Sequence, residues 1–252
     1  HPDGYVWIGT SRKGLFQLYP TPVRGYPIEG EPAESINMVG VDAQENVWAF
    51  GTSTALLVDG KLQVVNGRGC NAAAATRDGS FFWTMGEEGL ARFRDGQFEN
   101  HALGAELPSG LCRALLEDSK GHLWIGFLDW LVRIEGSVVR EVPPAPGSRF
   151  GQIRTMVEDP SGGIWVAGQT GLTRYMGQDV RHWRRGQEIP RSPVRALLAT
   201  ANGDLWLGGY GGGLSVLRND EVTSFSSSSG LHENVVTAIH EDGQGSLVLL
   251  GN

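Results

Sequence analysis

Apolar residues recur along the chain in a pattern marked by tryptophan. Six of the eight tryptophans are spaced 41, 35, 41, 41 and 41 residues apart, and Val248 follows 42 residues after the last of them. These six are Trp7, Trp48, Trp83, Trp124, Trp165 and Trp206. Most of them lie in a short apolar run that ends in glycine, such as Leu-Trp-Ile-Gly at 123–126. A fixed period of this length indicates a structural repeat that buries its apolar face only against copies of itself.

Each repeat predicts four short strands. An apolar segment ends in an acidic turn such as Glu117-Asp118, and the tryptophan strand, a glycine-containing loop and a third strand follow. A pair such as Asp59-Gly60 then leads into a polar fourth strand. Short apolar runs separated by Asp, Asn and Gly are typical of strands joined by tight turns. No segment has a sustained 3.6-residue apolar period, so we expect essentially no helix.

Repeats of four strands and about 40 residues predict an all-β fold, a β-propeller of four-stranded blades. Seven tryptophan-strand positions predict seven blade positions, the first and last incomplete, because the sequence begins and stops on the second strand of a repeat. The alternative is a six-bladed ring in which 235–242 pair beside 5–10 and 246–252 form a tail. We expect residues 1–252 to be a single propeller domain cut from a longer chain.

The charge and composition of the chain argue against several classes of binding partner and of chemical site. A net charge of −7 argues against a nucleic-acid partner or an anionic membrane surface, which both require a cationic face. No apolar run approaches the ~18 residues of a membrane span, so we expect no membrane insertion of this segment. Metal-binding and nucleophile motifs are missing from the sequence, and we therefore predict no cofactor, no metal and no catalytic residue.

The two cysteines occupy one repeat position. Cys70 lies nine residues before Gly79, and Cys112 lies nine residues before Gly121, each at the start of a predicted innermost strand. The pattern favours cysteine as a small apolar residue in an apolar position. A disulfide between them is the alternative, subject to strict limits on the distance between the two Cα atoms.

Several repeats share a longer phrase. It reads Arg113-Ala-Leu-Leu-Glu-Asp-Ser-Lys-Gly-His-Leu-Trp-Ile-Gly126, and residues 154–168 and 235–251 follow the same pattern. The phrase resembles the two-component regulator propeller repeat, over nearly the whole chain and most weakly at 66–86. The resemblance implies a bacterial periplasmic or other extracytoplasmic sensor domain, as in hybrid histidine kinases and diguanylate cyclases. It implies signal transduction through self-association of the full-length sensor, with no catalysis by the propeller.

Two other functions fit the same repeat. Streptogramin lyases are propellers with a similar Asp-x-x-Gly-x-Ile-Trp rhythm, so a propeller lyase is the alternative enzyme. A purely structural interaction scaffold is the third hypothesis. The phased tryptophans and the Glu-Asp pairs recur in many repeats, which favours packing and turn capping over chemistry.

One repeat position differs between blades in a way that predicts binding. The residue eight before the turn glycine is Arg113, Arg154 or Arg195 in three successive repeats, at the start of the innermost strand. Loops between the second and third strands, expected at the same end of the blades, carry Trp130, Gln169 and Tyr210. Clustered guanidiniums require anionic partners. We therefore predict a site for a small anionic or sugar-like ligand, with arginines paired to acidic groups of adjacent blades as the alternative.

Overall fold

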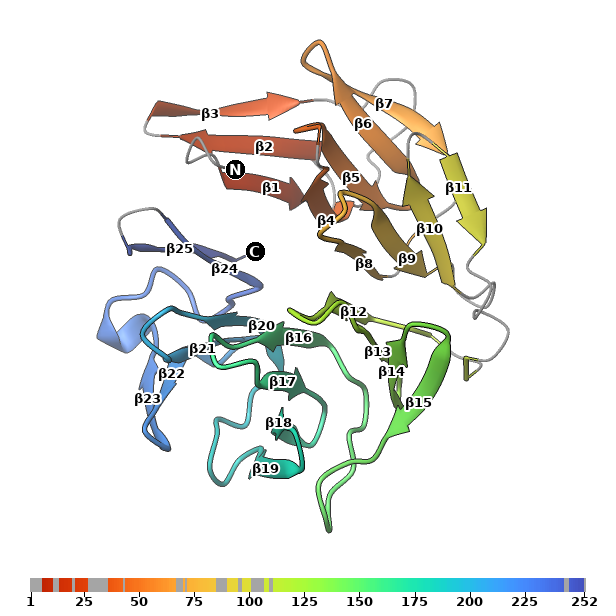
Figure 1. The fold of residues 1–252 in the computed structure, drawn as a ribbon. Helices are drawn as coiled ribbons and strands as arrows, with labels where there is room; N and C mark the ends of the chain where they lie inside the picture. The colour runs from red at the N-terminus through yellow and green to blue at the C-terminus, as the bar shows by residue number, and fades with distance from the viewer. Residues whose placement is uncertain are drawn as a thin grey trace. The chain divides into compact units, whose positions relative to one another are not determined.

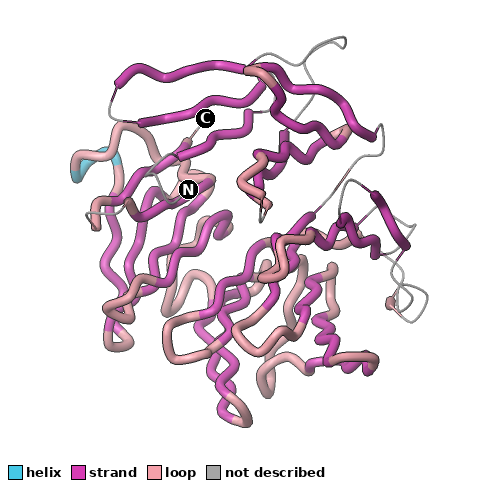
Figure 2. Tube along the Cα trace, turned by 45° about the horizontal axis from the view of Figure 1, so that its top comes forward, coloured by secondary structure: helices cyan, strands magenta, loops and turns pink. Residues whose placement is uncertain are grey.

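The computed structural model (Figures 1 and 2) describes residues 6–10, 14–19, 21–26, 36–42, 44–66, 70, 72–84, 90–94, 97–100, 107–108, 111–242 and 245–251. The side chains of Trp7 and Trp83 lie outside this description. The chain comprises two compact units, His1–Glu117 and Asp118–Asn252. The single domain over 1–252 stays a prediction, and each unit is described by itself.

The first unit contains antiparallel sheets built from consecutive strands. A three-stranded sheet consists of β1 (Val6–Thr10), β2 (Gly14–Tyr19) and β3 (Thr21–Tyr26). The next sheet consists of β4 (Ile36–Val41), β5 (Val47–Gly51), β6 (Thr54–Val58) and β7 (Lys61–Asn66). The third consists of β8 (Ala72–Ala75), β9 (Phe81–Thr84), β10 (Leu90–Arg94) and β11 (Gln97–Asn100). Strand β12 (Ala114–Glu117) ends the unit.

The second unit continues the same plan. β12 begins a sheet with β13 (Leu123–Gly126), β14 (Leu131–Glu135) and β15 (Val138–Val142). The following sheet consists of β16 (Thr155–Glu158), β17 (Ile164–Ala167), β18 (Gly171–Met176) and β19 (Asp179–Arg184). Then come β20 (Val194–Ala199), β21 (Leu205–Gly209), β22 (Gly213–Arg218) and β23 (Glu221–Phe225). After the 3₁₀ turn η2 (Ser227–Ser229), β24 (Ala238–Glu241) pairs with β25 (Leu247–Leu250).

The four-stranded blades are confirmed, but their predicted number is wrong. The described residues form five four-stranded sheets, neither seven nor six, together with the three-stranded and the two-stranded sheet. The physical reason is that the tryptophan period counts one strand per repeat, whereas a blade requires four hydrogen-bonded strands. Among the described helical elements only η2 occurs, so the expectation of essentially no helix is confirmed there.

The core follows the tryptophan strands. Every residue of β5, β13 and β17 is buried, whereas β15 and β23 are exposed or half-buried throughout. The rings of Trp165 and Trp183 pack with their centroids 5.0 Å apart. Trp206 is only half-buried and lies 6.2 Å from the ring of Phe225. Burial of the tryptophan strand against neighbouring elements is what the repeat pattern predicts.

Three of the tryptophan strands are tied to the turn that precedes them. The indole N–H groups of Trp48, Trp124 and Trp165 donate hydrogen bonds of 2.8, 2.9 and 2.9 Å to the first aspartate of that turn. These acceptors are Asp42, Asp118 and Asp159. Buried indole N–H groups require such a partner. Turn capping is therefore the role of these aspartates.

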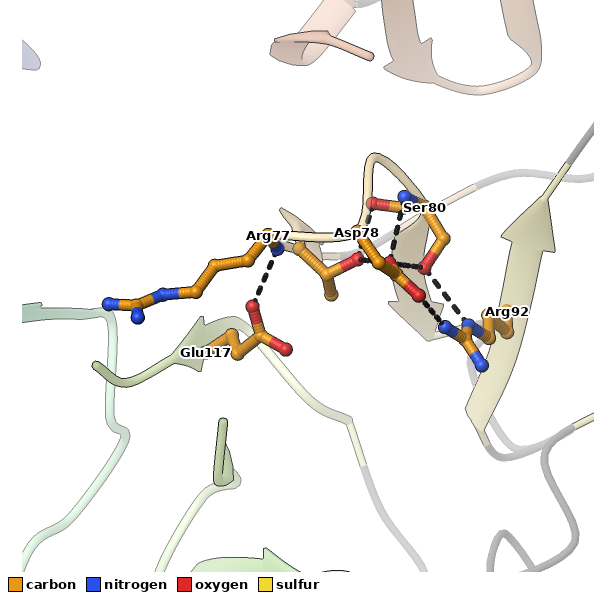
Figure 3. A network of polar contacts seen from close by, with 6 residues as sticks. Arg77, Asp78, Ser80, Arg92 and Glu117 are labelled. Atoms are coloured by element: carbon orange, nitrogen blue, oxygen red, sulfur yellow. Dashed lines mark hydrogen bonds and ion pairs between the residues drawn. The ribbon is translucent and has the colours of Figure 1, made fainter. Parts of the chain in front are cut away.

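The glutamates of two Glu-Asp pairs accept a hydrogen bond from the turn of the preceding sheet. Glu117 Oε2 accepts a 2.7 Å hydrogen bond from the backbone N–H of Arg77 (Figure 3), and Glu158 Oε2 accepts one of 2.6 Å from Ser119. In the same turn as Arg77, Asp78 accepts hydrogen bonds from Ser80 and is ion-paired with Arg92. The Glu-Asp pairs thus have structural partners, as the repeat predicted.

The two cysteines are buried and are not joined by a disulfide. Cys70 Sγ contacts the carbonyl oxygen of Ala72 at 3.1 Å, and Cys112 Sγ contacts that of Ala114 at 3.5 Å. This shared geometry confirms that they occupy one repeat position. Burial raises the pKa of the Cys70 thiol to about 12, although backbone hydrogen bonds with Thr84 and Ala72 act in the opposite direction. The interpretation as small apolar residues is confirmed, and the disulfide is not formed.

Candidate ligand-binding site

The three predicted arginines occupy equivalent places in the fold. Arg113 and Arg154 directly precede β12 and β16, and Arg195 is the second residue of β20. Arg113 is exposed and belongs to the first unit, whereas the half-buried Arg154 and the exposed Arg195 belong to the second. That the three guanidiniums meet at one opening stays a prediction.

Two of the predicted site residues contact each other. The guanidinium carbon of Arg195 lies 5.3 Å from the ring centroid of Tyr210, which is half exposed. The backbone N–H of Tyr210 donates a 3.0 Å hydrogen bond to the carbonyl of Pro193, so the loop after β21 is held against the segment before β20. Trp130, in the loop between β13 and β14, is 46% exposed. Arg195 and Tyr210 thus form an exposed cation–π pair.

Gln169 lies in a different place, on a cleft of about 830 Å³ in the second unit. We call it the arginine cleft, and its polar lining includes Asp129, Arg149, Gln169, His182, Arg184 and Arg185. These residues come from the β13–β14 loop, the β15–β16 connection, the β17–β18 loop and the end of β19. Arg154, Arg195, Trp130 and Tyr210 do not line it.

Close backbone packing forms one side of the arginine cleft. Gly151 has φ +56°, and a Cβ there would lie 2.7 Å from the Cβ of Gln169. The N–H and the hydroxyl of Thr170 both bond to carbonyl oxygens of the β15–β16 connection. The N–H of Arg185 donates a 2.9 Å bond to the carbonyl of Thr170. A glycine is required at 151 because a larger residue would strain the backbone and displace Gln169.

The charge of the arginine cleft is unbalanced. Arg149, Arg184 and Arg185 face a single lining carboxylate, Asp129. Within the described part of the chain, none of these three guanidiniums forms an ion pair. By contrast, six other arginines are each paired with Asp or Glu: Arg92, Arg133, Arg140, Arg174, Arg181 and Arg218.

His182 adds a titratable group to this cleft. Its Nδ1 lies 2.8 Å from the hydroxyl oxygen of Thr173 on the neighbouring strand. Burial, together with the positive charge of Arg184, lowers the pKa of His182 below its usual range. The lowered pKa favours the neutral form of this ring.

The repeat pattern gives no signal for the cationic residues of the arginine cleft. It relates equivalent positions of innermost strands and strand loops, whereas Arg184 and Arg185 end an outer strand and Arg149 lies in an irregular connection. The local signals are the Arg184-Arg185 pair and the arginine that follows Pro-Pro-Ala-Pro-Gly-Ser at 143–148. Neither signal repeats.

Two searches of the described residues gave negative results. They contain no group of three or more His, Cys, Asp or Glu placed to hold a metal ion. None of their helices has the length and apolar character needed to cross a membrane.

Comparison with known proteins shows that part of the chain is similar to a protein family. Residues 106–129, which include β12, the Asp118 turn and β13, match the family model described as "Two component regulator propeller". This segment is similar to a two component regulator propeller repeat. The predicted resemblance is confirmed. Among curated proteins, none matches the chain significantly.

Solved structures share the fold of this repeat protein at low identity. A streptogramin B lyase structure matches with a TM-score of 0.83 and 15% identity, over 100% of this chain and 88% of that chain. The WD40 beta propeller domain of Doa1 matches at 0.72 and 12%, over 99% and 86%. The extracellular domain assigned to the hybrid two component system BT3049 of B. thetaiotaomicron matches at 0.58 and 16%, over 98% of this chain but 42% of that one. The shared fold is the β-propeller.

Proposed function

We propose that this chain is the recognition propeller of a bacterial signal-transduction receptor, located outside the cytoplasm, and that it binds a ligand or partner without catalysis of its own. The observation that carries the proposal is the two component regulator propeller repeat at residues 106–129. The fold shared with an extracellular domain assigned to a hybrid two component system supports it. In such a receptor, self-association of the full-length sensor would relay binding to a kinase or cyclase output.

Within this function we assign ligand contact to the six residues predicted from the sequence: Arg113, Arg154, Arg195, Trp130, Gln169 and Tyr210. The Arg195–Tyr210 pair supports the assignment, because a guanidinium resting on an exposed ring keeps N–H groups free for an anion or a sugar oxygen. The exposed face of Trp130 suits an apolar sugar surface.

The test is ligand-dependent stability. Sulfate and glucuronate are titrated against the chain while the free energy of unfolding in urea is measured. Each tenfold increase in ligand concentration above the dissociation constant should raise the free energy of unfolding by about 1.4 kcal/mol through mass action. Replacing Arg113, Arg154 and Arg195 together by Gln should remove this gain and leave the ligand-free stability unchanged. A triple variant that unfolds without ligand would show that these arginines are structural.

A propeller lyase is the second candidate, favoured by the fold shared with streptogramin B lyase. At 15% identity this likeness extends to the fold alone. The discriminating measurement is incubation of the chain with streptogramin B, followed by mass spectrometry of the substrate. We expect no turnover. Conversion that depends on enzyme concentration would establish the lyase and displace the binding proposal.

A further inference from the structure

We propose that the arginine cleft is a second binding site, which takes a small ligand carrying at least two oxyanion groups (carboxylate, sulfate or phosphate). The proposal rests on the proposed function only in treating the propeller as a recognition module. Its residues differ from those assigned above, apart from Gln169.

The first argument is unpaired charge. Arg149, Arg184 and Arg185 line one cleft, and no described carboxylate forms an ion pair with them. The chain as a whole carries a net charge of −7, and six other arginines do have acidic partners. Three guanidiniums that line one cleft with a single lining carboxylate, Asp129, produce a local positive potential, and their planar N–H groups suit oxyanions.

The second argument is size. A volume of about 830 Å³ falls within the ~300–1,000 Å³ typical of small-molecule sites and far exceeds one sulfate or carboxylate. The cations also come from two separate segments, Arg149 from the β15–β16 connection and Arg184 with Arg185 from the end of β19. A ligand that satisfies both segments therefore requires anionic groups at two positions.

The third argument is that the cleft offers several kinds of polar group on a rigid backbone. Gln169 and Asp129 add hydrogen-bond acceptors, which suit hydroxyl groups on the same ligand. Gln169 is held against Gly151, and the backbone N–H of Arg184 donates a 2.9 Å hydrogen bond to Glu188 Oε2. Because the backbone that lines the cleft is already fixed, ligand binding would require little further loss of backbone conformational entropy.

The experiment compares two triple variants with the same change of charge. Calorimetric titration measures the binding of citrate, inorganic phosphate and sulfate at constant ionic strength. Citrate carries three carboxylates and should bind more tightly than either inorganic anion. Arg149→Gln/Arg184→Gln/Arg185→Gln should weaken citrate binding at least tenfold. Arg94→Gln/Arg140→Gln/Arg181→Gln, at three exposed positions outside both proposed sites, should change it by less than about threefold.

The outcomes separate the two sites. Equal loss of binding in both variants would indicate non-specific charge and overturn the cleft, as would a parent that binds none of the anions. A third variant, Arg113→Gln/Arg154→Gln/Arg195→Gln, tests the site of the proposed function: loss of citrate binding in this variant, with none in the cleft variant, would overturn the cleft while supporting that site. Should the cleft variant fold poorly by circular dichroism, Arg184→Gln alone, at an exposed side chain, repeats the test with a smaller expected loss.

Discussion

At the scale of single residues, the most heavily bonded carboxylate described is Asp159. Its oxygens accept hydrogen bonds from Trp165 Nε1, Arg174 Nε, Ser161 and the N–H of Gly163. The Arg174 guanidinium also lies over the Trp165 ring, with its carbon 5.5 Å from the centroid. One aspartate therefore joins the turn, the tryptophan strand and the third strand of its blade.

Replacing Asp159 by Ala should lower the free energy of unfolding by about 2–3 kcal/mol, because the indole N–H and the guanidinium lose their shared acceptor. The measurement is urea unfolding followed by tryptophan fluorescence. Asp179→Ala is the matched control, since Asp179 is exposed and makes no side-chain bond among the described residues. The control should change stability by less than about 0.5 kcal/mol. Equal losses would refute the role of Asp159.

His182 provides a residue-scale test of the arginine cleft. Burial is the larger cause of its lowered pKa and Arg184 the second. Arg184→Gln should therefore raise the pKa of His182 without restoring it fully, as measured by NMR titration of the ring protons. Arg181→Gln removes a cation that instead pairs with Asp220 and stacks on Trp183, and it should leave the titration unchanged. The geometry would be contradicted if both variants gave the same shift.

At the scale of elements, the tryptophan strand determines how each blade is buried. Trp124 on β13 is 3% exposed, and the Arg133 guanidinium carbon lies 5.2 Å from its ring centroid. Trp124→Ala should cost about 3–5 kcal/mol, because it leaves a cavity and removes the partner of Asp118. Trp130→Ala, six residues along the chain at a 46% exposed position, is the matched control. Unfolding in urea at the same midpoint for parent and Trp124→Ala would refute the packing.

Strands were predictable from the sequence because their pattern repeats. The Leu-Trp-Ile-Gly run at 123–126 coincides with β13, and the third strand that the repeat predicts after a glycine-containing loop is found as β18. The number of complete blades was predicted wrongly because the tryptophan period locates one strand of each repeat. It does not show how many strands pair in each sheet. The arginine cleft was missed because its cations occur in one repeat only, where comparison between repeats gives no signal. Of the predicted site residues, the structure brings together Arg195 and Tyr210.

At the scale of the whole molecule, four aspartates make stability depend on pH. Burial alone would raise the pKa of Asp78, Asp118 and Asp159, but hydrogen bonds from turn residues, Trp124 or Arg174 outweigh it and lower the pKa of each. The hydrogen bond from Arg218 is the main cause that lowers the pKa of Asp204. All four bind protons less readily in the folded chain than in the unfolded chain.

The free energy of unfolding should therefore fall as the solution becomes acidic. A carboxylate with a lowered folded pKa contributes its stabilisation fully above about pH 5, and this is lost as pH falls below the unfolded value of about 3.9 toward the folded one. Urea unfolding at pH 7, 5, 4 and 3 measures the loss. Asp118→Asn should be less stable than the parent at pH 7 and should lose less stability between pH 5 and 3, because it has one fewer such carboxylate to protonate. Asp179→Asn should follow the parent at every pH. If Asp118→Asn instead ran parallel to the parent down to pH 3, the Asp118 bonds to Trp124 and to the His122 N–H would not be the source of the acid sensitivity.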